Sequence, residues 1–394
     1  MLAHRNPWFL IAVCLVFSGL GGWTVSQAEA APIFAIIDAG SSGSRLFLYR
    51  VEKDAQGYPK AESVPVIGLN KIKPGISTLV TTPEAAGPYI QPLLSSLEVT
   101  LKSLGVPQDQ VFFSIMATAG MRVESPLQQA KVYTAVTQQA KASVPGMTIQ
   151  YATTIQGRYE GAFEWLSVNY LQGHLGSGLS ASTGVLETGG GSYQMTWETP
   201  PLKRQTLDVF SLDYGPSRYT LFSRSFTGLG GNYSREDTTD DPNCFPKDYP
   251  LASGALGTGN YAKGLLLHRK MIRARDFRIP PTVKPPSLET MLGVGLFKGV
   301  AQDLKLGDRV SSVRVDAAAR LIAATPWSVL LAGAPNNPFL FSQVDAAQLV
   351  SEILRTWFSE RQELPVADTL NGKEISWTLG AALFLSSGNI LPTP

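Results

Sequence analysis

The sequence has little cysteine, little histidine and no excess of either charge. Its two cysteines, Cys14 and Cys244, are too few for a disulfide framework, and its three scattered histidines offer no imidazole metal cluster. With 33 basic against 31 acidic side chains, the 394-residue chain also lacks the positive charge with which proteins bind nucleic acid. Any bound metal is therefore expected to be a hard cation held by oxygen ligands.

The chain also lacks a hydrophobic run long enough to span a bilayer. Residues 8–20 form an apolar stretch of 13 residues, short of the roughly 20 that a membrane helix needs. Arg5 precedes this stretch, and the small-residue pattern Ala28-Glu29-Ala30 follows it, as is typical of a secretory signal peptide. We expect residues 1–30 to be removed and the protein to be exported, periplasmic or secreted, without a stable membrane anchor; the alternative is an uncleaved anchor.

Two loops rich in glycine and serine stand about 150 residues apart, each between strand-like runs. They are Asp38-Ala-Gly-Ser-Ser-Gly-Ser-Arg45 and Glu187-Thr-Gly-Gly-Gly-Ser192. In both, an acid stands two residues before a glycine and a serine follows. The recurrence indicates a duplicated unit, and the alternation of strand and helix patterns indicates an α/β fold of two similar lobes.

Two such loops, facing each other across a cleft, suit a phosphate chain bound with a divalent cation. Glycine lets backbone N–H groups and serine hydroxyls approach phosphate oxygens closely, and carboxylates hold Mg²⁺ through water. A Walker A sequence is missing, and the nearest dinucleotide fingerprint, Gly293-Val-Gly295, has Lys298 where its third glycine belongs. Either loop alone would be consistent with an ordinary hairpin.

Two further stretches carry candidate chemistry. Thr118 and Arg122 follow the end of a predicted strand. Thr118 is placed to reach a metal-bound water, and Arg122 is placed to reach a phosphate oxygen or a loop carboxylate. The alternative is an ordinary strand end with an arginine on the surface. Glu160 stands at a glycine-flanked helix start, where a carboxylate can compensate the helix dipole or orient a water for in-line attack. Glu164, one turn further on, is expected to face solvent or to be structural.

Helical spacing predicts several helices and one exposed basic face. The basic residues between His268 and Arg278 are expected to form a solvated helix face. The helices are expected over residues 93–104, ending at Gly105; from Ser125-Pro126 to about 144–146; over 158–173; and over 344–358.

These elements occur in the order and spacing of the apyrase, or nucleoside triphosphate diphosphohydrolase, family, which the chain resembles from about Phe34 to Ala382. The resemblance is carried by residues 38–45, 117–122, 157–170, 189–194 and 377–380.

The resemblance implies an actin-like pair of ribonuclease-H-like lobes with the active site in the cleft between them. Lobe I would comprise residues 31–165 and 375–394, and lobe II residues 166–374. It further implies hydrolysis of nucleoside tri- and diphosphates to the monophosphate, dependent on Mg²⁺ or Ca²⁺. We expect a monomer with no nucleic-acid partner.

Carried over position by position, the resemblance also implies roles for residues of this chain. Glu160 is the base, and Ser192 and Gln194 place the attacking water. The phosphates are lined by Ser41, Ser42, Gly43, Ser44, Arg45, Gly189, Gly190 and Gly191. The outer shell of the metal is formed by Asp38, Thr118 and Glu187, and Arg122 and Trp377 support the site.

The chain departs from the family pattern at several positions. The family usually has Asp where Glu187 stands, which could change the metal preference, and an acid where Tyr159 stands. The triple glycine 189–191 is expected to make its loop looser. Most members of the family carry several disulfides in the second lobe, whereas this chain has a single cysteine there, Cys244. The candidates for stacking on the base are Phe339 and Phe341.

Two other functions stay open at this point. An exopolyphosphatase would share the loops and the glutamate but needs no base pocket. An actin-like nucleotide-binding module with weak turnover would act by lobe closure and would not need Glu160. Export disfavours a sugar kinase, because ATP is scarce outside the cytoplasm.

Overall fold

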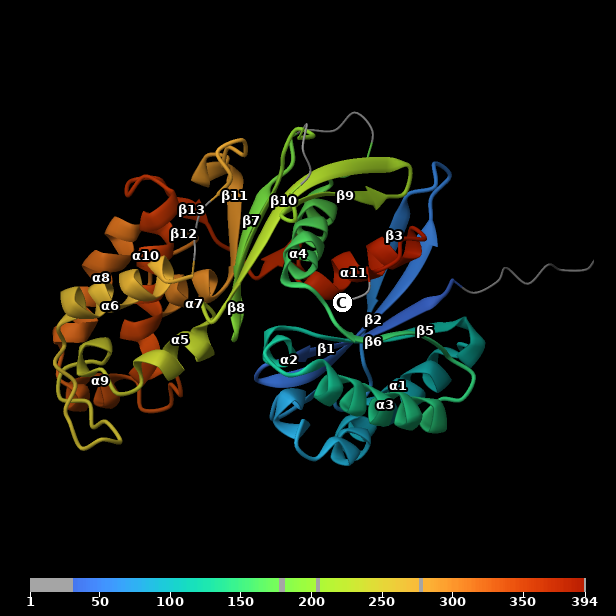
Figure 1. Cartoon of the computed structure of the whole chain (residues 1–394), viewed down its shortest axis with the longest axis horizontal. Coiled ribbons are helices and arrows are strands. Elements are labelled where there is room, and N and C mark those ends of the chain that lie inside the picture. The colour runs from blue at the N-terminus through green and yellow to red at the C-terminus, as the bar shows by residue number, and fades with distance from the viewer. Residues whose placement is uncertain (1–30, 177–180, 203–205, 276–278, 393–394) are drawn as a thin grey trace, which may run out of the picture. The chain divides into compact units, whose positions relative to one another are not determined.

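The computed structural model describes residues 31–176, 181–202, 206–275 and 279–392. The predicted signal peptide, residues 1–30, lies outside these residues. Two main sheets organise the described chain (Figure 1).

The first sheet is built around a largely buried apolar strand, residues 33–40. Its strands are β1 (Ile33–Gly40), β2 (Gly43–Lys53), β3 (Pro59–Val64), β4 (Lys71–Ile72), β5 (Val111–Ala117) and β6 (Thr148–Thr154). They lie in the order β3-β2-β1-β5-β6, with β4 beside β2. The helices of this part are α1 (Ala86–Leu104), α2 (Ala119–Arg122) and α3 (Pro126–Ser143).

The second sheet repeats the plan of the first. Its strands are β7 (Gly184–Thr188), β8 (Ser192–Glu198), β9 (Val209–Tyr214), β10 (Ser217–Thr227) and β11 (Met291–Gly295), in the order β11-β7-β8-β10-β9. Just as β1 pairs antiparallel with β2 and parallel with β5, β7 pairs antiparallel with β8 and parallel with β11. The predicted duplication and the α/β class are therefore confirmed, and both glycine-serine loops are hairpin turns.

The remaining helices and short strands follow in the second half of the chain, apart from α4, which links the sheets. The helices are α4 (Gly157–Gln172), α5 (Gly231–Thr238), α6 (Tyr261–Arg273), α7 (Leu296–Asp303), α8 (Ser312–Ala324), α9 (Trp327–Gly333), α10 (Gln343–Trp357) and α11 (Trp377–Ser386). Short antiparallel pairs are made by β12 (Arg309–Val310) with β13 (Leu364–Pro365) and by β14 (Thr369–Leu370) with β15 (Lys373–Glu374).

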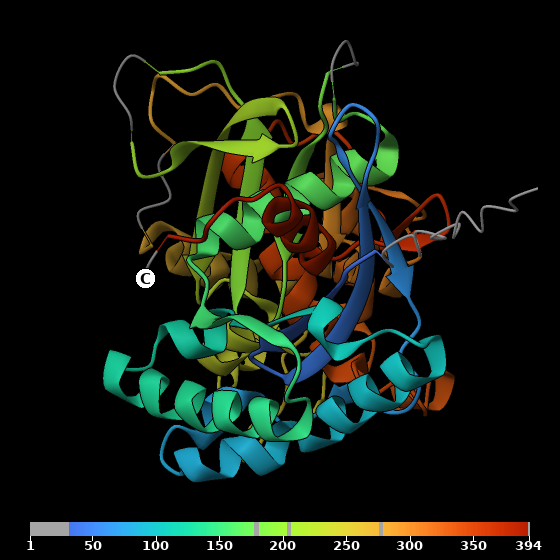
Figure 2. The ribbon, with the colours of Figure 1, turned by 90° about the vertical axis from the view of Figure 1, so that its right-hand side faces the viewer.

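The hydrophobic core is layered, because successive residues of a strand point to opposite faces of its sheet. Ile33, Ala35 and Ile37 of β1 pack with α1 and α3, which lie side by side in Figures 1 and 2. Phe34 and Ile36 face the other way, toward α4 and α11. These two helices also cover one face of the second sheet, and α6, α7, α8 and α10 cover its opposite face. The pair α4 and α11 therefore lies between the two sheets.

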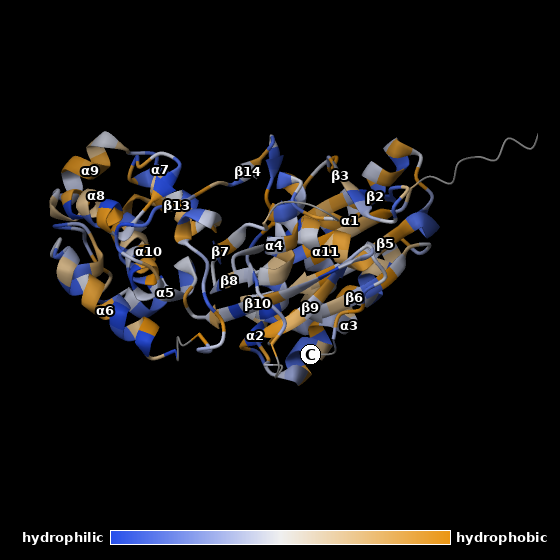
Figure 3. Cartoon of the chain, turned by 90° about the horizontal axis from the view of Figure 1, so that it is seen from above, coloured by the Kyte–Doolittle hydropathy of each residue, from blue (hydrophilic) through white to orange (hydrophobic). Residues whose placement is uncertain are grey.

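Close backbone contact joins α4 to α11. A Cβ atom at Gly380 would lie 1.9 Å from the carbonyl oxygen of Phe163, so only glycine fits at this crossing. Nearly every residue of α11 is buried, and Figure 3 shows the helix mostly in hydrophobic colours. This C-terminal helix therefore docks onto the core.

Helix ends follow the predicted signals. Ser125 caps α3 by accepting a hydrogen bond from the backbone of Gln128, whose side chain accepts one in return. The helix α1 ends at Gly105, which has a left-handed backbone conformation. The helices predicted over 158–173 and 344–358 are α4 and α10.

The basic residues after residue 267 are only in part a solvated helix face. His268 is fully buried on α6, with its Nδ1 3.0 Å from the carbonyl oxygen of Gly264 and its Nε2 3.1 Å from Oδ1 of Asp345. Arg269 forms two hydrogen bonds to Glu352 on α10. The expectation is therefore wrong for His268, because α10 supplies a carboxylate inside the core; Arg278 lies outside the described residues.

Among the described helices, no single one is both long and apolar enough to cross a bilayer. The helices α8 and α9 meet the criterion only together, as a pair bent by 106°.

Candidate active site

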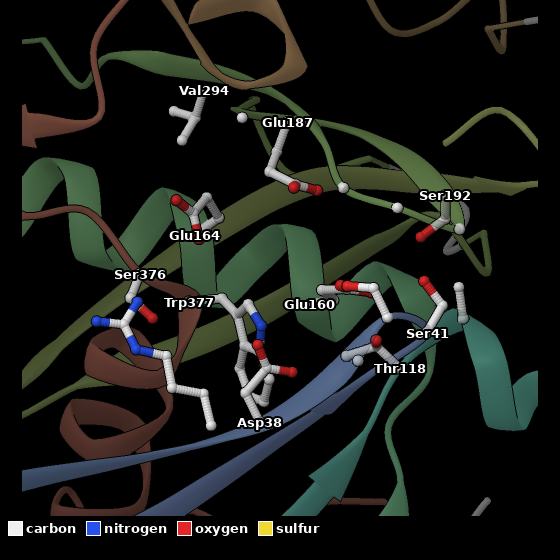
Figure 4. A pocket seen from close by; sticks show the side chains of 18 of the residues that line it. Asp38, Ser41, Thr118, Glu160, Glu164, Glu187, Ser192, Val294, Ser376 and Trp377 are labelled. Carbon is white, nitrogen blue, oxygen red and sulfur yellow. The ribbon is translucent and has the colours of Figure 1, made fainter. Parts of the chain in front are cut away.

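A pocket lies at the turns of the two duplicated hairpins (Figure 4). The end of β5, the helix α4 and the start of α11 complete its walls. The residues predicted from the sequence that line it are Asp38, Ser41, Ser42, Gly43, Arg45, Thr118, Glu160, Glu187, Gly189, Gly190, Gly191, Ser192 and Trp377.

The two loops approach each other closely. A Cβ atom at Gly190 would lie 2.7 Å from Oγ of Ser41, and one at Gly191 would lie 2.7 Å from Cβ of Ala119. The carbonyl oxygens of the triple glycine, 189–191, all accept hydrogen bonds from backbone N–H groups of residues 228–233. The expectation of a looser loop is therefore wrong: Gly190 makes room for Ser41 of the facing loop and Gly191 for Ala119 of α2, and backbone hydrogen bonds hold the loop in place.

The backbone donors of both loops are free. The N–H groups of Ser41, Ser42, Gly190 and Gly191 donate to no acceptor among the described residues. Clustered backbone N–H groups of this kind form concavities that bind anions.

Ser44 is an exception among the predicted phosphate-lining residues. Side chains alternate along β2, so Gly43 and Arg45 face the pocket while Ser44 points to the other side. Ser44 is fully buried, and its hydroxyl lies 3.1 Å from the hydroxyl of Tyr89. The structure corrects the expectation that the side chain of Ser44 lines the phosphates.

Glu160 is held in a hydrogen-bonded group in the first turn of α4. Its side-chain Oε2 accepts hydrogen bonds from Nη2 of Arg122 and, at 2.9 Å, from Nε2 of Gln194. Ser192 closes the group, because its hydroxyl lies 2.6 Å from Nε2 of Gln194 and 3.3 Å from Nη1 of Arg122. The other carboxylate oxygen, Oε1, has no hydrogen-bond partner among the described residues and is available to the pocket.

Arg122 and Gln194 lie behind Glu160. Arg122 is not the surface arginine of the alternative interpretation: its side chain is 13% exposed, and it also donates to the carbonyl oxygen of Ile155 at 2.9 Å. Both residues hold Glu160 in position rather than facing the pocket themselves.

Asp38 and Glu187 lie near the ends of β1 and β7 and carry buried carboxylate oxygens. Burial and the charge of Glu160 raise the pKa of Asp38 to about 7, although Lys71, Arg45 and a hydrogen bond from Trp377 oppose this shift. Burial, followed by the charges of the neighbouring carboxylates, raises the pKa of Glu187 well above its usual range.

Two unpartnered carboxylate oxygens in the pocket fit a bound cation. Oδ1 of Asp38 and Oε2 of Glu187 are buried without a hydrogen-bond donor among the described residues. Carboxylate oxygens in this state can be satisfied by a hard cation or its water shell. Thr118, at the end of β5, lines the same pocket with its hydroxyl available to such a water.

Glu164 is the main site residue that the sequence did not identify. It is only 3% exposed and lines the pocket, so the expectation that it faces solvent is wrong. Burial and the charges of Glu160, Asp38 and Glu374 raise its pKa to about 8. Its spacing of four residues from Glu160 was the available signal, because such residues share one face of a helix.

Arg45, Lys71 and Glu374 form the charged rim of the pocket. Arg45 donates to Glu374 at 2.6 and 3.1 Å, and its guanidinium lies 4.6 Å from the centre of the Phe47 ring. Lys71, on β4, also lines the pocket. Neither Lys71 nor Glu374 belongs to a local motif, so no sequence signal pointed to them.

The aromatic residues singled out from the sequence lie elsewhere. Tyr159 packs against Phe210, with ring centres 4.9 Å apart. Phe341 stacks on Tyr249 and contacts Arg235, and Phe339 is 62% exposed. None of these residues lines the described pocket.

Known proteins resemble this chain in sequence and in structure. The nucleoside-diphosphatase mig-23 of Caenorhabditis briggsae is 24% identical over 98% of this chain and 83% of its own length. A nucleoside triphosphate hydrolase structure from Neospora caninum superposes with a TM-score of 0.65 at 14% identity, covering 92% of this chain and 94% of the other. The structure of a Ppx/GppA family member from Aquifex aeolicus superposes with a TM-score of 0.53 at 15% sequence identity. The superposition covers 89% of this chain and 96% of the other.

The structural likenesses show the fold alone, and they agree with the predicted α/β architecture built around two sheets. The family model of the GDA1/CD39 nucleoside phosphatases matches residues 26–242, more than half of the chain. The chain therefore belongs to the GDA1/CD39 (nucleoside phosphatase) family and is a phosphoanhydride hydrolase.

Proposed function

We propose that the protein removes the terminal phosphate from nucleoside tri- and diphosphates, leaving the monophosphate. The observation that carries the proposal is the position of Glu160: its carboxylate lines the same pocket as the two loops with free backbone donors. A phosphate chain held by those donors would present its terminal phosphorus to a water beside Oε1 of Glu160.

The steps follow from the residues in place. The N–H groups of the loops bind phosphate oxygens. Ser192 orients the attacking water next to Glu160, and Gln194, which does not line the pocket as the resemblance implied, holds Glu160 and Ser192 in position. The water oxygen forms a bond to the terminal phosphorus while the bridging P–O bond breaks, and Oε1 of Glu160 accepts the proton. Catalysis of this kind consists mainly of positioning and charge neutralisation.

A divalent cation belongs to this proposal. Asp38, Thr118 and Glu187 would hold Mg²⁺ or Ca²⁺, mostly through water, and the bound ion would neutralise charge on the phosphate oxygens. The oxygens of Asp38 and Glu187 that lack donors support this assignment.

The location of the enzyme, its oligomeric state and the place of its cleft are also part of the proposal. Export through residues 1–30 would place the enzyme in the periplasm or outside the cell, acting on free nucleotides as a monomer. The active-site cleft would lie between lobe I, residues 31–165 and 375–394, and lobe II, residues 166–374.

A substrate panel tests the proposal. Orthophosphate release from ATP, ADP, AMP and polyphosphate is measured with Mg²⁺, with Ca²⁺ and with a chelator. We expect release from ATP and ADP only in the presence of a cation, and none from AMP. Polyphosphate as the only substrate would overturn the proposal in favour of an exopolyphosphatase, and binding of ATP without turnover would favour an actin-like binding module.

A further inference from the structure

Three side chains that can bind a metal meet at a place that the proposed reaction does not use. They are Cys244, which ends the single-turn helix Pro242–Cys244, His268 on α6 and Asp345 on α10. The thiol sulfur, an imidazole nitrogen and a carboxylate oxygen of these residues all lie within 4.8 Å of one another. The histidines are scattered in the sequence, but the fold brings one of them to a cysteine and an acid.

The cluster is enclosed in the core and is separate from the candidate active site. Cys244 and His268 are fully buried, Asp345 is 2% exposed, and Phe245 and Leu251 pack with Cys244. The helices α6 and α10, side by side in Figure 1, cover the face of the second sheet that α4 and α11 do not cover. None of the three side chains lines the described pocket at the hairpin turns.

The contacts of His268 leave one of its nitrogens in need of a positive partner. Nδ1 lies 3.0 Å from the carbonyl oxygen of Gly264, which only accepts hydrogen bonds, so Nδ1 carries a proton. Nε2 is buried and makes no hydrogen bond with a described residue, although it lies 3.1 Å from Oδ1 of Asp345. The lone pair of a neutral imidazole would face a carboxylate there, so a second proton or a metal ion must join them.

The outer contacts of the cluster are those of metal ligands. A metal-bound histidine usually donates its other ring N–H to a carboxylate or a backbone carbonyl, and a metal-bound carboxylate is itself hydrogen-bonded. Nδ1 of His268 meets the first condition through the carbonyl of Gly264. Oδ1 of Asp345 meets the second by accepting a hydrogen bond from the hydroxyl of Thr238 at 2.8 Å.

An unused acceptor beside the cluster can hold a water ligand. Gln348 lies one turn after Asp345 on α10, and its amide nitrogen donates to the carbonyl oxygen of Asn243, the residue before Cys244, at 3.0 Å. Its Oε1 is buried without a donor among the described residues. A water bound to a metal ion would supply the missing hydrogen bond.

We propose that Cys244, His268 and Asp345 bind a zinc ion that ties residues 242–244 to α6 and α10. Sulfur, imidazole nitrogen and carboxylate oxygen are the donors of zinc, whereas Ca²⁺ and Mg²⁺ prefer oxygen alone. Zinc bond lengths of about 2.0–2.3 Å set tetrahedral ligand atoms roughly 3.3–3.7 Å apart. The 3.1 Å between Nε2 and Oδ1 is close to this spacing, and the thiol needs to move by about 1 Å at most.

Charge separates this site from an ordinary buried ion pair. The thiolate and the carboxylate carry two negative charges, which equal the charge of one zinc ion, so the loaded cluster is neutral inside the core. An ion pair of His268 with Asp345 would need only a proton, and it would give Cys244 no part. The thiol therefore distinguishes the two arrangements.

The zinc content of the purified protein tests the inference. The protein is produced with added zinc, purified without chelator, dialysed and analysed by mass spectrometry for metals, and we expect one zinc ion per chain. Cys244→Ala should lower the zinc affinity, measured by competition with a chromophoric chelator, at least about a hundredfold, because loss of an outer-shell partner alone costs 10- to 100-fold. The matched control is His174→Gln, at a histidine whose ring faces Thr183 outside the cluster, which should keep its zinc.

Cobalt serves as a spectroscopic probe of the same site. Protein produced with Co²⁺ in place of zinc should show the charge-transfer absorption of a bond between cobalt and a thiolate. Cys244→Ala and Cys244→Ser should both lack this absorption, and His174→Gln should keep it. The absorption identifies the sulfur ligand, because cobalt bound by carboxylates alone does not produce it.

Two results would overturn the inference: no bound zinc in the unaltered protein, or equal zinc content in Cys244→Ala and the unaltered protein. The first would leave the ion pair of His268 with Asp345 as the arrangement in the core, and the second would assign the zinc to other residues. Circular dichroism shows whether Cys244→Ala is folded, and Cys244→Ser serves if it is not. The inference does not depend on the proposed function, and folded Cys244→Ala should hydrolyse nucleotides like the unaltered protein.

Discussion

Replacing Glu160 by glutamine removes the proton acceptor while keeping the size of the side chain. In the structure, Oε1 of Glu160 is the carboxylate oxygen left free for a water, and an amide in its place accepts no proton from that water. Removal of a positioned general base costs roughly 10²–10⁴ in rate, which corresponds to about 3–5 kcal/mol of transition-state stabilisation. We expect kcat to fall by this factor with little change in nucleotide affinity.

The same substitution also removes the charge that pairs with Arg122. The two side chains are 11% and 13% exposed, so the pair is largely buried. Removing one partner of a buried pair costs about 3–5 kcal/mol of unfolding free energy. Arg122 keeps its hydrogen bonds to Ile155 and Ser192, so we expect the lower end of this range.

The assay combines rate, binding and stability for Glu160→Gln. Orthophosphate release is measured at saturating ATP, nucleotide binding by calorimetry, and unfolding by denaturant titration, each beside the control Glu98→Gln, at an exposed residue of α1. Turnover within a factor of three of the unaltered protein would refute the assignment of the base. A loss of nucleotide binding equal to the loss of rate would instead show that Glu160 acts in binding.

Three further predictions concern the loop, the buried histidine and pH. Gly191→Ala places its Cβ atom 2.7 Å from Cβ of Ala119 on α2, which must displace the loop, and should lower kcat/KM by roughly 10²-fold, as expected for misplacement by about 1 Å. Gly299→Ala, which meets no atom within 4 Å, should not change kcat/KM. Burial alone lowers the pKa of His268, but its buried carboxylate partner, Asp345, more than offsets this effect, so the pKa is raised. His268→Gln should therefore lower the free energy of unfolding by about 3 kcal/mol at pH 6. Denaturant titration should show this difference shrinking as the pH rises through the raised pKa. Because the pKa values of Asp38 and Glu164 are raised to about 7 and about 8, the native protein binds more protons than the unfolded chain between pH 4 and 8; the thermal midpoint in chelator should therefore fall as pH rises over this window, and a rising midpoint would contradict these shifts.

Local signals in the sequence predicted the parts of the site that local structure builds. The two glycine-serine loops are tight hairpin turns, and the chemistry of a turn is encoded in its own residues. Gly105 and Ser125 likewise mark helix ends, because capping depends on neighbours in the chain.

The residues that sequence reasoning misplaced depend on contacts between distant segments. Glu164 was expected to face solvent or to be structural, but α4 is enclosed by the second sheet and by α11, and the side chain is buried in the pocket lining. His268 was assigned to a solvated face because its partner, Asp345, lies on another helix. Ser44 differs, because the alternation of β2 already places it opposite Gly43 and Arg45.

Hydrolysis of ATP in water enriched in oxygen-18 tests most directly the central claim that a water beside Glu160 attacks the terminal phosphorus. The account predicts one labelled oxygen in each released orthophosphate, no label in ADP or AMP, and labelled orthophosphate formed roughly a hundredfold or more slowly by Glu160→Gln. Label in AMP, release of pyrophosphate, or an unchanged rate in Glu160→Gln would contradict it.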